Sequence, residues 1–375
     1  MHNTIAEIDP VQWNELAGHN AFATHDWLKT VEASCRVRLQ TLYFTLAEGG
    51  RLVAASVCYV CPSTRDIETL DDLIFGRLAS SFRALGMSYL PALVCGPLLG
   101  YGWHIGAHCS LSSVEAGEIR QRLLDAIARE ADGRRLTLAF VHVLDEDRQL
   151  QSLLTTNGYL RCRNIPVASL DLKWPSFEAY LMSLPSKRRR EFQRQTNRYR
   201  EAGNELVCLG DPVAIESRLL QLLDANGVKR NGRAFACRAP FFTSLANASV
   251  DVLRVFGSRK AGVLTATSVM LVRGNTAFLI AIGVDYEAAA DDYSYFQITY
   301  NAPIAYAIET RVRRLYYGRG LDDVKVRRGC SLTESWIYVR PGGAIALAAN
   351  RAWFPIASAW NRRKLTSEAR QSLTN

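Results

Sequence analysis

The hydrophobic positions change their period several times along the first half of the chain, and each change predicts an element. Two β-rich runs, 39–46 and 52–60, flank Gly49 and Gly50, which is the usual pattern of a β-hairpin. Buried-strand runs and helical spacing then alternate. These segments are helix 64–87, strand 89–95, helix 113–131, strand 136–143, helix 145–158 and strand 167–172. The first half therefore predicts the α/β order β-β-α-β-α-β-α-β.

A similar order of elements follows Trp174, and we place a domain boundary there. The predicted domains are residues 1–173 and residues 174–375. The second domain carries a basic linking helix at 186–202, strand 206–209, helices 215–226 and 240–246, strands 250–256, 262–272 and 276–284, and a terminal helix 346–364 with a basic end. No residue-level repeat relates the two halves, so they resemble each other in element order alone.

The stretch 293–338 combines an aromatic helix, a glycine-bearing loop and clustered charges. Phe296, Tyr300, Ile304 and Ile308 recur at four-residue spacing, which predicts a helix with one apolar stripe. The predicted sequel is a strand at 315–317, a glycine-bearing loop at 318–320, charged residues at 322–329 and a strand at 336–339. Charged residues so close to a strand end are costly to bury, so they form either a solvated loop or a site.

The segment 186–202 is the most basic part of the chain. Lys187, Arg190, Arg194 and Arg198 fall on one face of the predicted helix, while Phe192 and Tyr199 mark its packed side. Like charges at this spacing repel each other, and contacts with an anion would offset the repulsion. Two readings stay open, a solvated basic helix and a binding face for a phosphate-rich ligand.

The whole chain is also basic, with a formal net charge of +9 and a pI of about 9.1. This excess suits tRNA, a CoA moiety, an acidic carrier protein or a membrane surface. The nine cysteines form no disulfide framework, and the Cys58–Cys61 pair lacks the second ligand pair that a zinc site needs. We expect buried thiols in a reducing, cytoplasmic protein without a signal peptide or a membrane span.

A glycine-rich turn at 96–102 follows a predicted strand, and a loop of free backbone N–H groups at a helix start can hold an anion. It lacks the Arg/Gln-x-x-Gly-x-Gly/Ala signature of acetyl-CoA sites, so a plain linking loop is the other reading. The pair His104 and His108 lacks the acid of a zincin motif. The sequence contains no G-x-S-x-G, no Walker A motif and no zinc constellation, which disfavours a hydrolase, a P-loop ATPase and a metalloenzyme.

The order of aromatic helix, Ala-Ile-Glu, basic turn, strand, glycine and Lys-x-x-Arg-Gly resembles the second acyltransferase-like domain of the Fem and BioF2-like group of the GNAT superfamily. Fem proteins carry Phe-Lys-x-x-Phe-Gly at this place. The matching positions here are Val324, Lys325, Arg328 and Gly329, so the lysine and the glycine match and the two aromatic residues do not. The two missing aromatic residues argue against the muropeptide acceptor of Fem ligases. The Lys-x-x-Arg-Gly form is more similar to the predicted N-acyltransferase branch of the group.

This resemblance implies an α/β (α+β) fold with two tandem GNAT-like domains, each a mixed β-sheet flanked by helices. It also implies an N-acyltransferase in which an amine attacks the donor carbonyl directly, with no tightly bound cofactor and no metal. The donor would be a thioester, acyl-CoA or an acyl carrier protein. Two alternatives stay open: an aminoacyl-tRNA-dependent aminoacyltransferase, and a non-catalytic basic module that binds polyanions.

By the same resemblance and by position, we assign candidate roles to individual residues. The acceptor is an amine-bearing small molecule or peptide. The candidate catalytic residues are Lys325, Asp285 and Tyr300; the candidate substrate-binding residues are Arg328, Gly329, Tyr286 and Arg319; the candidate donor-binding residues are Lys187, Arg190, Arg194 and Arg198.

Overall fold

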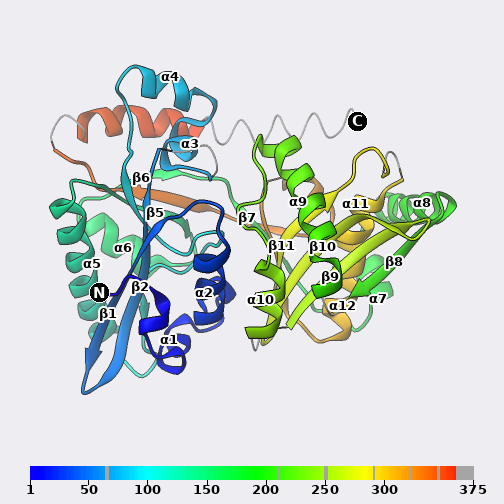
Figure 1. Cartoon of the computed structure of the whole chain (residues 1–375), viewed down its shortest axis with the longest axis horizontal. Coiled ribbons are helices and arrows are strands. Elements are labelled where there is room, and N and C mark those ends of the chain that lie inside the picture. The colour runs from blue at the N-terminus through cyan, green and yellow to red at the C-terminus, as the bar shows by residue number, and fades with distance from the viewer. Residues whose placement is uncertain are drawn as a thin grey trace. The chain divides into compact units, whose positions relative to one another are not determined.

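A computed structural model describes residues 1–63, 67–209, 212–248, 252–289, 292–320, 322–343 and 347–359. The chain divides into two compact units. Unit 1 contains Met1–Ala33, Val37–Pro166 and the described residues from Thr333 onward, and unit 2 contains Ser34–Arg36 and Val167–Leu332. We describe each unit by itself (Figure 1).

Unit 1 is a mixed sheet flanked by helices. Its strand order is β1 (Gln40–Glu48), β2 (Arg51–Cys61), β3 (Ala92–Cys95), β5 (Thr137–Leu144), β14 (Ser335–Val339) and β6 (Leu160–Arg163), and β4 (Gly106–Ala107) pairs with β2. Its helices are α1 (Pro10–Ala17), α2 (His25–Ser34), α3 (Leu70–Phe75), α4 (Ala79–Ala84), α5 (Ser113–Gly133), α6 (Arg148–Thr156) and a helix at 347–359. The predicted hairpin is β1–β2.

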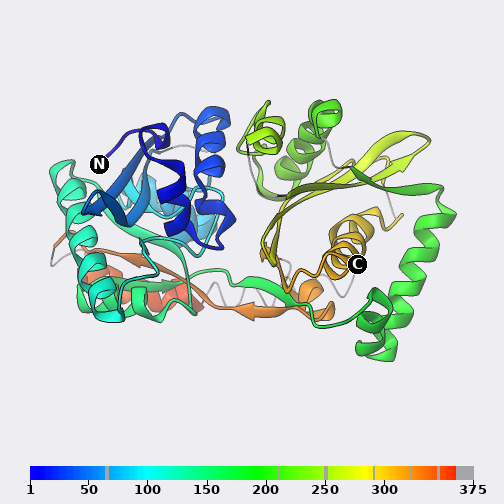
Figure 2. The ribbon, with the colours of Figure 1, turned by 90° about the horizontal axis from the view of Figure 1, so that it is seen from below.

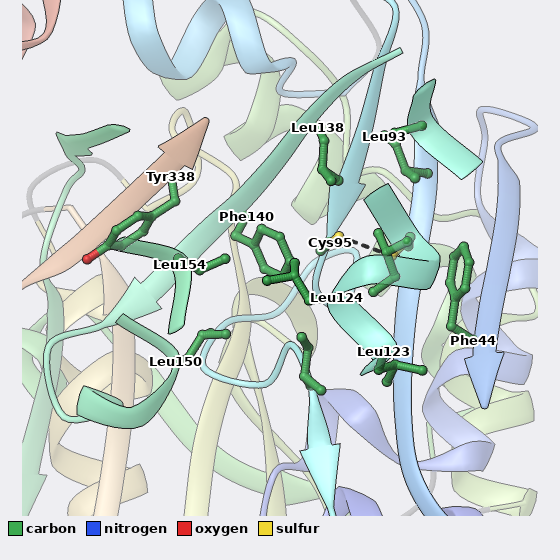
Figure 3. Close-up of a cluster of buried hydrophobic side chains, with 14 of the residues drawn as sticks. Phe44, Leu93, Cys95, Leu123, Leu124, Leu138, Phe140, Leu150, Leu154 and Tyr338 are labelled. Carbon is green, nitrogen blue, oxygen red and sulfur yellow. Dashed lines mark hydrogen bonds between the residues drawn. The ribbon is translucent and has the colours of Figure 1, made fainter. Parts of the chain in front are cut away.

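The side chains of β5 alternate between the two faces of this sheet, as the two-residue period of a strand requires. Leu138 and Phe140 belong to the core under α5 and α6, whereas Ala139 and Val141 belong to the core under α3 and helix 347–359. Tyr338 of β14 lies in the same cluster as Phe140 (Figure 3). Residues near the end of the chain therefore complete the core of the first unit.

Unit 2 is a second mixed sheet with helices on both faces. Its strand order is β13 (Ser331–Thr333), β7 (Val167–Asp171), β12 (Arg314–Arg319), β11 (Thr276–Val284), β10 (Val263–Arg273), β9 (Val252–Lys260) and β8 (Asn204–Leu209). Its helices are α7 (Phe177–Ser183), α8 (Ser186–Glu201), α9 (Glu216–Asn231), α10 (Phe241–Ala248), α11 (Ser294–Phe296), a π-helical segment (Gln297–Asn301), α12 (Ala302–Glu309) and α13 (Asp322–Arg327). Figure 2 shows α9 and α10 on one face of the sheet and the helix 294–309 on the other.

The predicted fold class is confirmed, because each unit is a mixed sheet flanked by helices. The units differ from the predicted domains in two places. β7 was assigned to the first domain, but it pairs with β12 in the second sheet. β14 was assigned to the second domain, but it lies between β5 and β6 in the first sheet. Both pairings join segments far apart in sequence, and element order alone cannot reveal them.

Smaller differences concern short elements. Strand β6 was not predicted, since its residues alternate with arginines and span only four positions. The charged segment after β12 was expected to form either a solvated loop or a site, and the structure has the short helix α13 there. The terminal helix is present at 347–359, whereas 346 and 360–364 of the prediction lie outside the described residues. Over the residues that the structure describes, no helix has both the length and the apolar character needed to cross a membrane.

Candidate active site

The two parallel strands of unit 2 separate halfway along their length. β11 and β12 pair only from Thr276–Phe278 to Arg314–Tyr316, although β11 continues to Val284 and β12 to Arg319. In open α/β sheets, ligands bind outside the carboxyl ends of parallel strands. The residues beyond Phe278 and Tyr316 are therefore the natural place for a site in this unit.

A β-bulge lies on each strand just after the point where they separate. Ile280 is the extra residue of β11 against β10, and Tyr317 is the extra residue of β12 against β7. Bulges bend a strand and re-aim a side chain, and they are common beside active sites. Here the bulge of β12 carries the buried side chain of Tyr317.

Arg328 is a buried cation of this region, with 4% of its surface exposed. Its Cζ lies 3.8 Å from the ring centre of Phe192 and 5.1 Å from the ring centres of Phe296 and Tyr300. Its Nη2 donates to Oε1 of Gln195 at 2.6 Å, and its Nη1 has no hydrogen-bond partner among the described residues. Burial lowers the pKa of the guanidinium, but an arginine stays charged at neutral pH.

Tyr300 and Tyr317 lie beside this cation, with ring centres 5.2 Å apart and ring planes tilted by 33°. Tyr300 comes from the π-helical segment, a type of irregularity that is frequent at functional sites. Burial raises the pKa of both phenols, so they are hydrogen-bond donors rather than bases at neutral pH. The hydroxyl of Tyr317 has no partner in the described part of the chain.

Lys325 has a different position from Arg328, although only three residues separate them. Its buried Nζ donates to the carbonyl oxygens of Gly318 at 3.0 Å and Arg319 at 3.1 Å. The ammonium therefore holds the carboxyl end of β12. Gly329 has a φ of +86°, a conformation that favours glycine, and it turns the chain between α13 and β13.

Asp285 and Tyr286 end β11 and contact α9. The Asp285 carboxylate accepts from the N–H groups of Ala288 and Glu287 and from Arg218 Nη2 at 2.9 Å. These contacts lower the pKa of Asp285, the bond from Ala288 most of all. An ionised carboxylate with this many donors is a weak proton acceptor, so its geometry fits a loop anchor better than a general base.

Tyr286 and Tyr295 connect this end of β11 with the Arg328 cluster. The hydroxyl of Tyr286 donates to Asn226 at 2.7 Å and accepts from Arg230 Nε at 3.0 Å. Burial raises the pKa of the partly buried Tyr295, and the charges of Arg230 and Arg328 lower it. Tyr295 is thus close enough to interact electrostatically with the exposed Arg230 and with the buried Arg328.

A carboxylate already occupies the start of the helix that follows β11. Asp292 is 3% exposed, accepts from the N–H of Ser294 at 2.8 Å and from Asn204 Nδ2 at 3.0 Å. A free helix start attracts phosphate, because its N–H groups lack partners. Here the position is filled by a negative side chain, which disfavours the pyrophosphate of CoA at this place.

The outer face of α8 carries the predicted basic row. Lys187, Arg190, Arg194 and Arg198 are exposed, and none of them forms an ion pair with a described carboxylate. The guanidinium of Arg194 lies 5.4 Å from the ring centre of Tyr293. The inner face packs through Phe192, Gln195 and Tyr199, which are all buried. We name Lys187, Arg190, Arg194 and Arg198 the basic row.

In unit 1 the corresponding opening between parallel strands is filled. β3 pairs with β5 only up to Cys95 and Phe140, and His104 then lies against β5 with its Nε2 2.6 Å from the carbonyl oxygen of Val141. The glycine-rich turn packs closely, since a Cβ on Gly100 would lie 2.4 Å from Cβ of Phe22. This turn is a linking loop and leads into β4, not into a helix.

The structure brings Arg328 and Tyr300 together, and Gly329 follows Arg328 in the chain. Lys325 and Arg319 meet at the carboxyl end of β12. Asp285 and Tyr286 belong to the neighbouring end of β11. Sequence reasoning missed the polar role of Gln195, the unpartnered hydroxyl of Tyr317 and the hydrogen bond from the Ser294 N–H to Asp292. Gln195 lies between Phe192 and Tyr199 on the packed face, and a glutamine on an apolar face is a sequence signal for a buried polar contact. The described residues contain no cluster of three metal-ligating side chains.

Known proteins resemble this chain in family and in fold. A family model named FemAB-like, described as peptidoglycan biosynthesis/recognition, matches residues 4–340. Similar solved structures include FemX, with a TM-score of 0.57, 11% identity and coverage of 90% of this chain and 96% of that chain. They also include L-PGS from Bacillus licheniformis, with a TM-score of 0.55, 13% identity and coverage of 92% and 97%. A comparison with curated proteins found no match.

Proposed function

Because the chain belongs to the FemAB-like family, an acyltransferase group, we propose that it transfers an aminoacyl group from a charged tRNA to an amine. In this proposal the tRNA binds the basic row of α8, and the amine attacks where β11 and β12 separate. The exposed basic row is the observation that carries the proposal. It extends over 12 residues, or about 17 Å of helix, which suits several phosphates better than a single pyrophosphate.

The residues beyond β11 support this choice of donor over acyl-CoA. The segment 285–292 contains four acidic residues, and one of them, Asp292, accepts a hydrogen bond from the N–H of Ser294 at the start of the following helix. Both features repel the phosphates that CoA would bring to this loop. In this proposal the basic row of α8, and not the segment 285–292, binds the phosphates of the tRNA.

In the proposed reaction the protein orients the two substrates and forms no covalent intermediate. The amine of the acceptor attacks the ester carbonyl, the ester bond to the tRNA ribose breaks, and an amide forms. Lys325 fixes the end of β12 through the carbonyl groups of Gly318 and Arg319, which positions Tyr317 and the loop after it. Such positioning contributes much of the rate enhancement in direct transfers.

A thioester on an acidic carrier protein is the second candidate donor. The observation that favours it is the length of α8, which ends at Glu201 and passes through Gly203 directly into β8, without the coiled-coil arm that some Fem proteins have. An acidic carrier would bind the same basic row. A tRNA donor predicts that RNA co-purifies with the protein, whereas a carrier-protein donor predicts that an acidic protein does.

The test is native mass spectrometry of the protein purified at low salt. We expect a co-purifying RNA of tRNA size, which is lost when Arg190, Arg194 and Arg198 are all changed to Glu. The matched control changes Lys29, Arg38 and Arg77 to Glu, since these three are exposed on unit 1 and alter the net charge equally. Recovery of CoA or of an acyl thioester from the wild-type protein would overturn the proposed donor.

A further inference from the structure

The Arg328 cluster contains a positive charge without a matching negative charge. Among the described residues no carboxylate pairs with Arg328. The acidic group that acts on its charge is Glu191, which is half-buried and already lies 3.6 Å from Arg188. Buried arginines are normally paired with a carboxylate, because an unpaired buried charge is costly.

The contacts of the guanidinium leave one of its edges, at Nη1, without a hydrogen bond. Phe192 lies against its face, and Gln195 takes the hydrogen bond of Nη2. The N–H groups of Nη1 are buried and unpartnered, as is the hydroxyl of Tyr317, whose charge state also acts on Arg328. The hydroxyl of Tyr300 is likewise buried and unpartnered, and these three groups can donate to the two oxygens of a carboxylate.

The surrounding rings indicate which anion fits. Phe296 and Tyr300 lie on the guanidinium at 5.1 Å and offer apolar surface to the carbon next to a carboxylate. A single negative charge neutralises the single positive charge of Arg328. A phosphate carries more charge and a larger hydration shell, which this aromatic surrounding cannot replace.

We propose that Arg328 binds the free carboxylate of the acceptor, so that the acceptor is an amino acid or a peptide-like amine with a carboxylate. This inference rests on the proposed function for the identity of the ligand as acceptor. In an aminoacyl-tRNA the carboxyl group of the donor is esterified, and so the free carboxylate belongs to the molecule that supplies the amine. Arg328 then sets acceptor specificity for the reaction.

The central experiment introduces a carboxylate of the protein beside Arg328, in the place proposed for the carboxylate of the ligand. Gln195→Glu has the same shape and places a carboxylate on Arg328. The matched control is Gln193→Glu, which makes the same change on the exposed face of α8. The probe is propionate, compared with propionamide at constant ionic strength, and the readout is the melting temperature of the full chain.

For the wild-type protein and Gln193→Glu, we expect propionate at ten times its Kd to raise the melting temperature by about 3 °C over propionamide. Gln195→Glu should show no such difference. Equal shifts for propionate and propionamide in the wild-type protein, or an unchanged propionate shift in Gln195→Glu, would overturn the proposal. A larger effect of inorganic phosphate than of propionate would also overturn it, in favour of a phosphate ligand.

A second variant covers the case in which Gln195→Glu fails to fold. Arg328→Met fills the space between the rings without a charge. If Arg328 is kept for a ligand, this variant melts at or above the wild-type temperature and loses the propionate shift, because removing an unpaired buried charge is not destabilising. A lower melting temperature with a retained propionate shift would assign Arg328 a structural role and overturn the proposal.

A transfer assay separates this inference from the proposed function. With charged tRNA as donor, amino acids should be acylated at least tenfold faster than their carboxamides. Equal rates would refute the carboxylate site while leaving tRNA-dependent transfer intact. An Arg328-dependent propionate shift without any transfer from tRNA would keep the carboxylate site and refute the proposed donor.

Discussion

Arg328 and Gly329 are neighbours in sequence but act on the site in different ways. The side chain of Arg328 enters the aromatic cluster, while Gly329 makes the turn that lets the chain continue into β13. The Lys-x-x-Arg-Gly pattern therefore combines one strand-end lysine, one buried cation and one turn. Its residue types predicted a site, but their contacts with α8 could not be predicted, because Gln195 lies 133 positions away.

Gly329→Ala tests the turn. A Cβ there would lie 3.6 Å from Cδ1 of Leu170, an ordinary contact, so the cost comes from the backbone conformation alone. We expect a loss of about 1–2 kcal/mol in the free energy of unfolding, measured by urea denaturation. Gly117→Ala, in the exposed middle of α5, is the control and should instead stabilise the protein by about 0.5–1 kcal/mol. Equal effects at the two positions would contradict a strained turn at Gly329.

Asp285→Asn tests whether Asp285 anchors the loop after β11 or acts as a catalytic base. The folded-state pKa of Asp285 is lowered, so its contribution to stability is present above the unfolded pKa of about 4 and is lost as pH falls through the folded pKa. The variant should lose about 1 kcal/mol at pH 7 and less at pH 3. Its transfer rate should fall less than tenfold. A loss of 100-fold or more with unchanged stability would instead identify Asp285 as a catalytic base.

At the level of elements, α8 has two faces with separate tasks. Its buried face reaches Arg328 through Phe192 and Gln195, and its exposed face carries the basic row. The spacing of arginines and aromatic residues predicted both faces, since the helical period sorts them directly. The sequence could not predict that the inner face belongs to the site, because that depends on packing against residues 296–328.

Phe192→Ala and Arg190→Ala test this division. Removal of a buried phenylalanine leaves a cavity, and we expect Phe192→Ala to lower the free energy of unfolding by about 3–5 kcal/mol. Arg190→Ala removes an exposed side chain and should change stability by less than about 0.5 kcal/mol while weakening tRNA binding. Urea denaturation and filter binding measure the two effects. Comparable destabilisation by both variants would mean that the basic row is part of the fold.

For the whole molecule, the chain passes from unit 1 to unit 2 and returns. β14 fills the place between β5 and β6, and Asn164 N–H donates to the carbonyl oxygen of Ser335 at 2.9 Å. The continuous apolar run 336–339 predicted a strand correctly. They could not predict its sheet, because a strand with both faces buried fits either core equally well.

Fragments of the chain test whether unit 1 needs β14 to fold. Residues 1–173 lack β14, so we expect no cooperative thermal unfolding from this fragment. Residues 1–166 joined by a short Gly/Ser linker to 333–375 should regain a cooperative transition, since Asn164 and Ser335 are adjacent. Circular dichroism during heating measures both. Cooperative unfolding of residues 1–173 alone would contradict the role of β14 in unit 1.

The central claim is that the donor is a tRNA bound on the basic row, and the salt dependence of tRNA binding tests it most directly. Each phosphate contact contributes roughly 0.7–0.9 to the slope of log K against log salt concentration. Changing Arg190, Arg194 and Arg198 to Gln should therefore reduce the slope by about 2–3, whereas changing Lys29, Arg38 and Arg77 to Gln should not. An unchanged slope in the first variant, or displacement of tRNA by acyl-CoA, would contradict the claim.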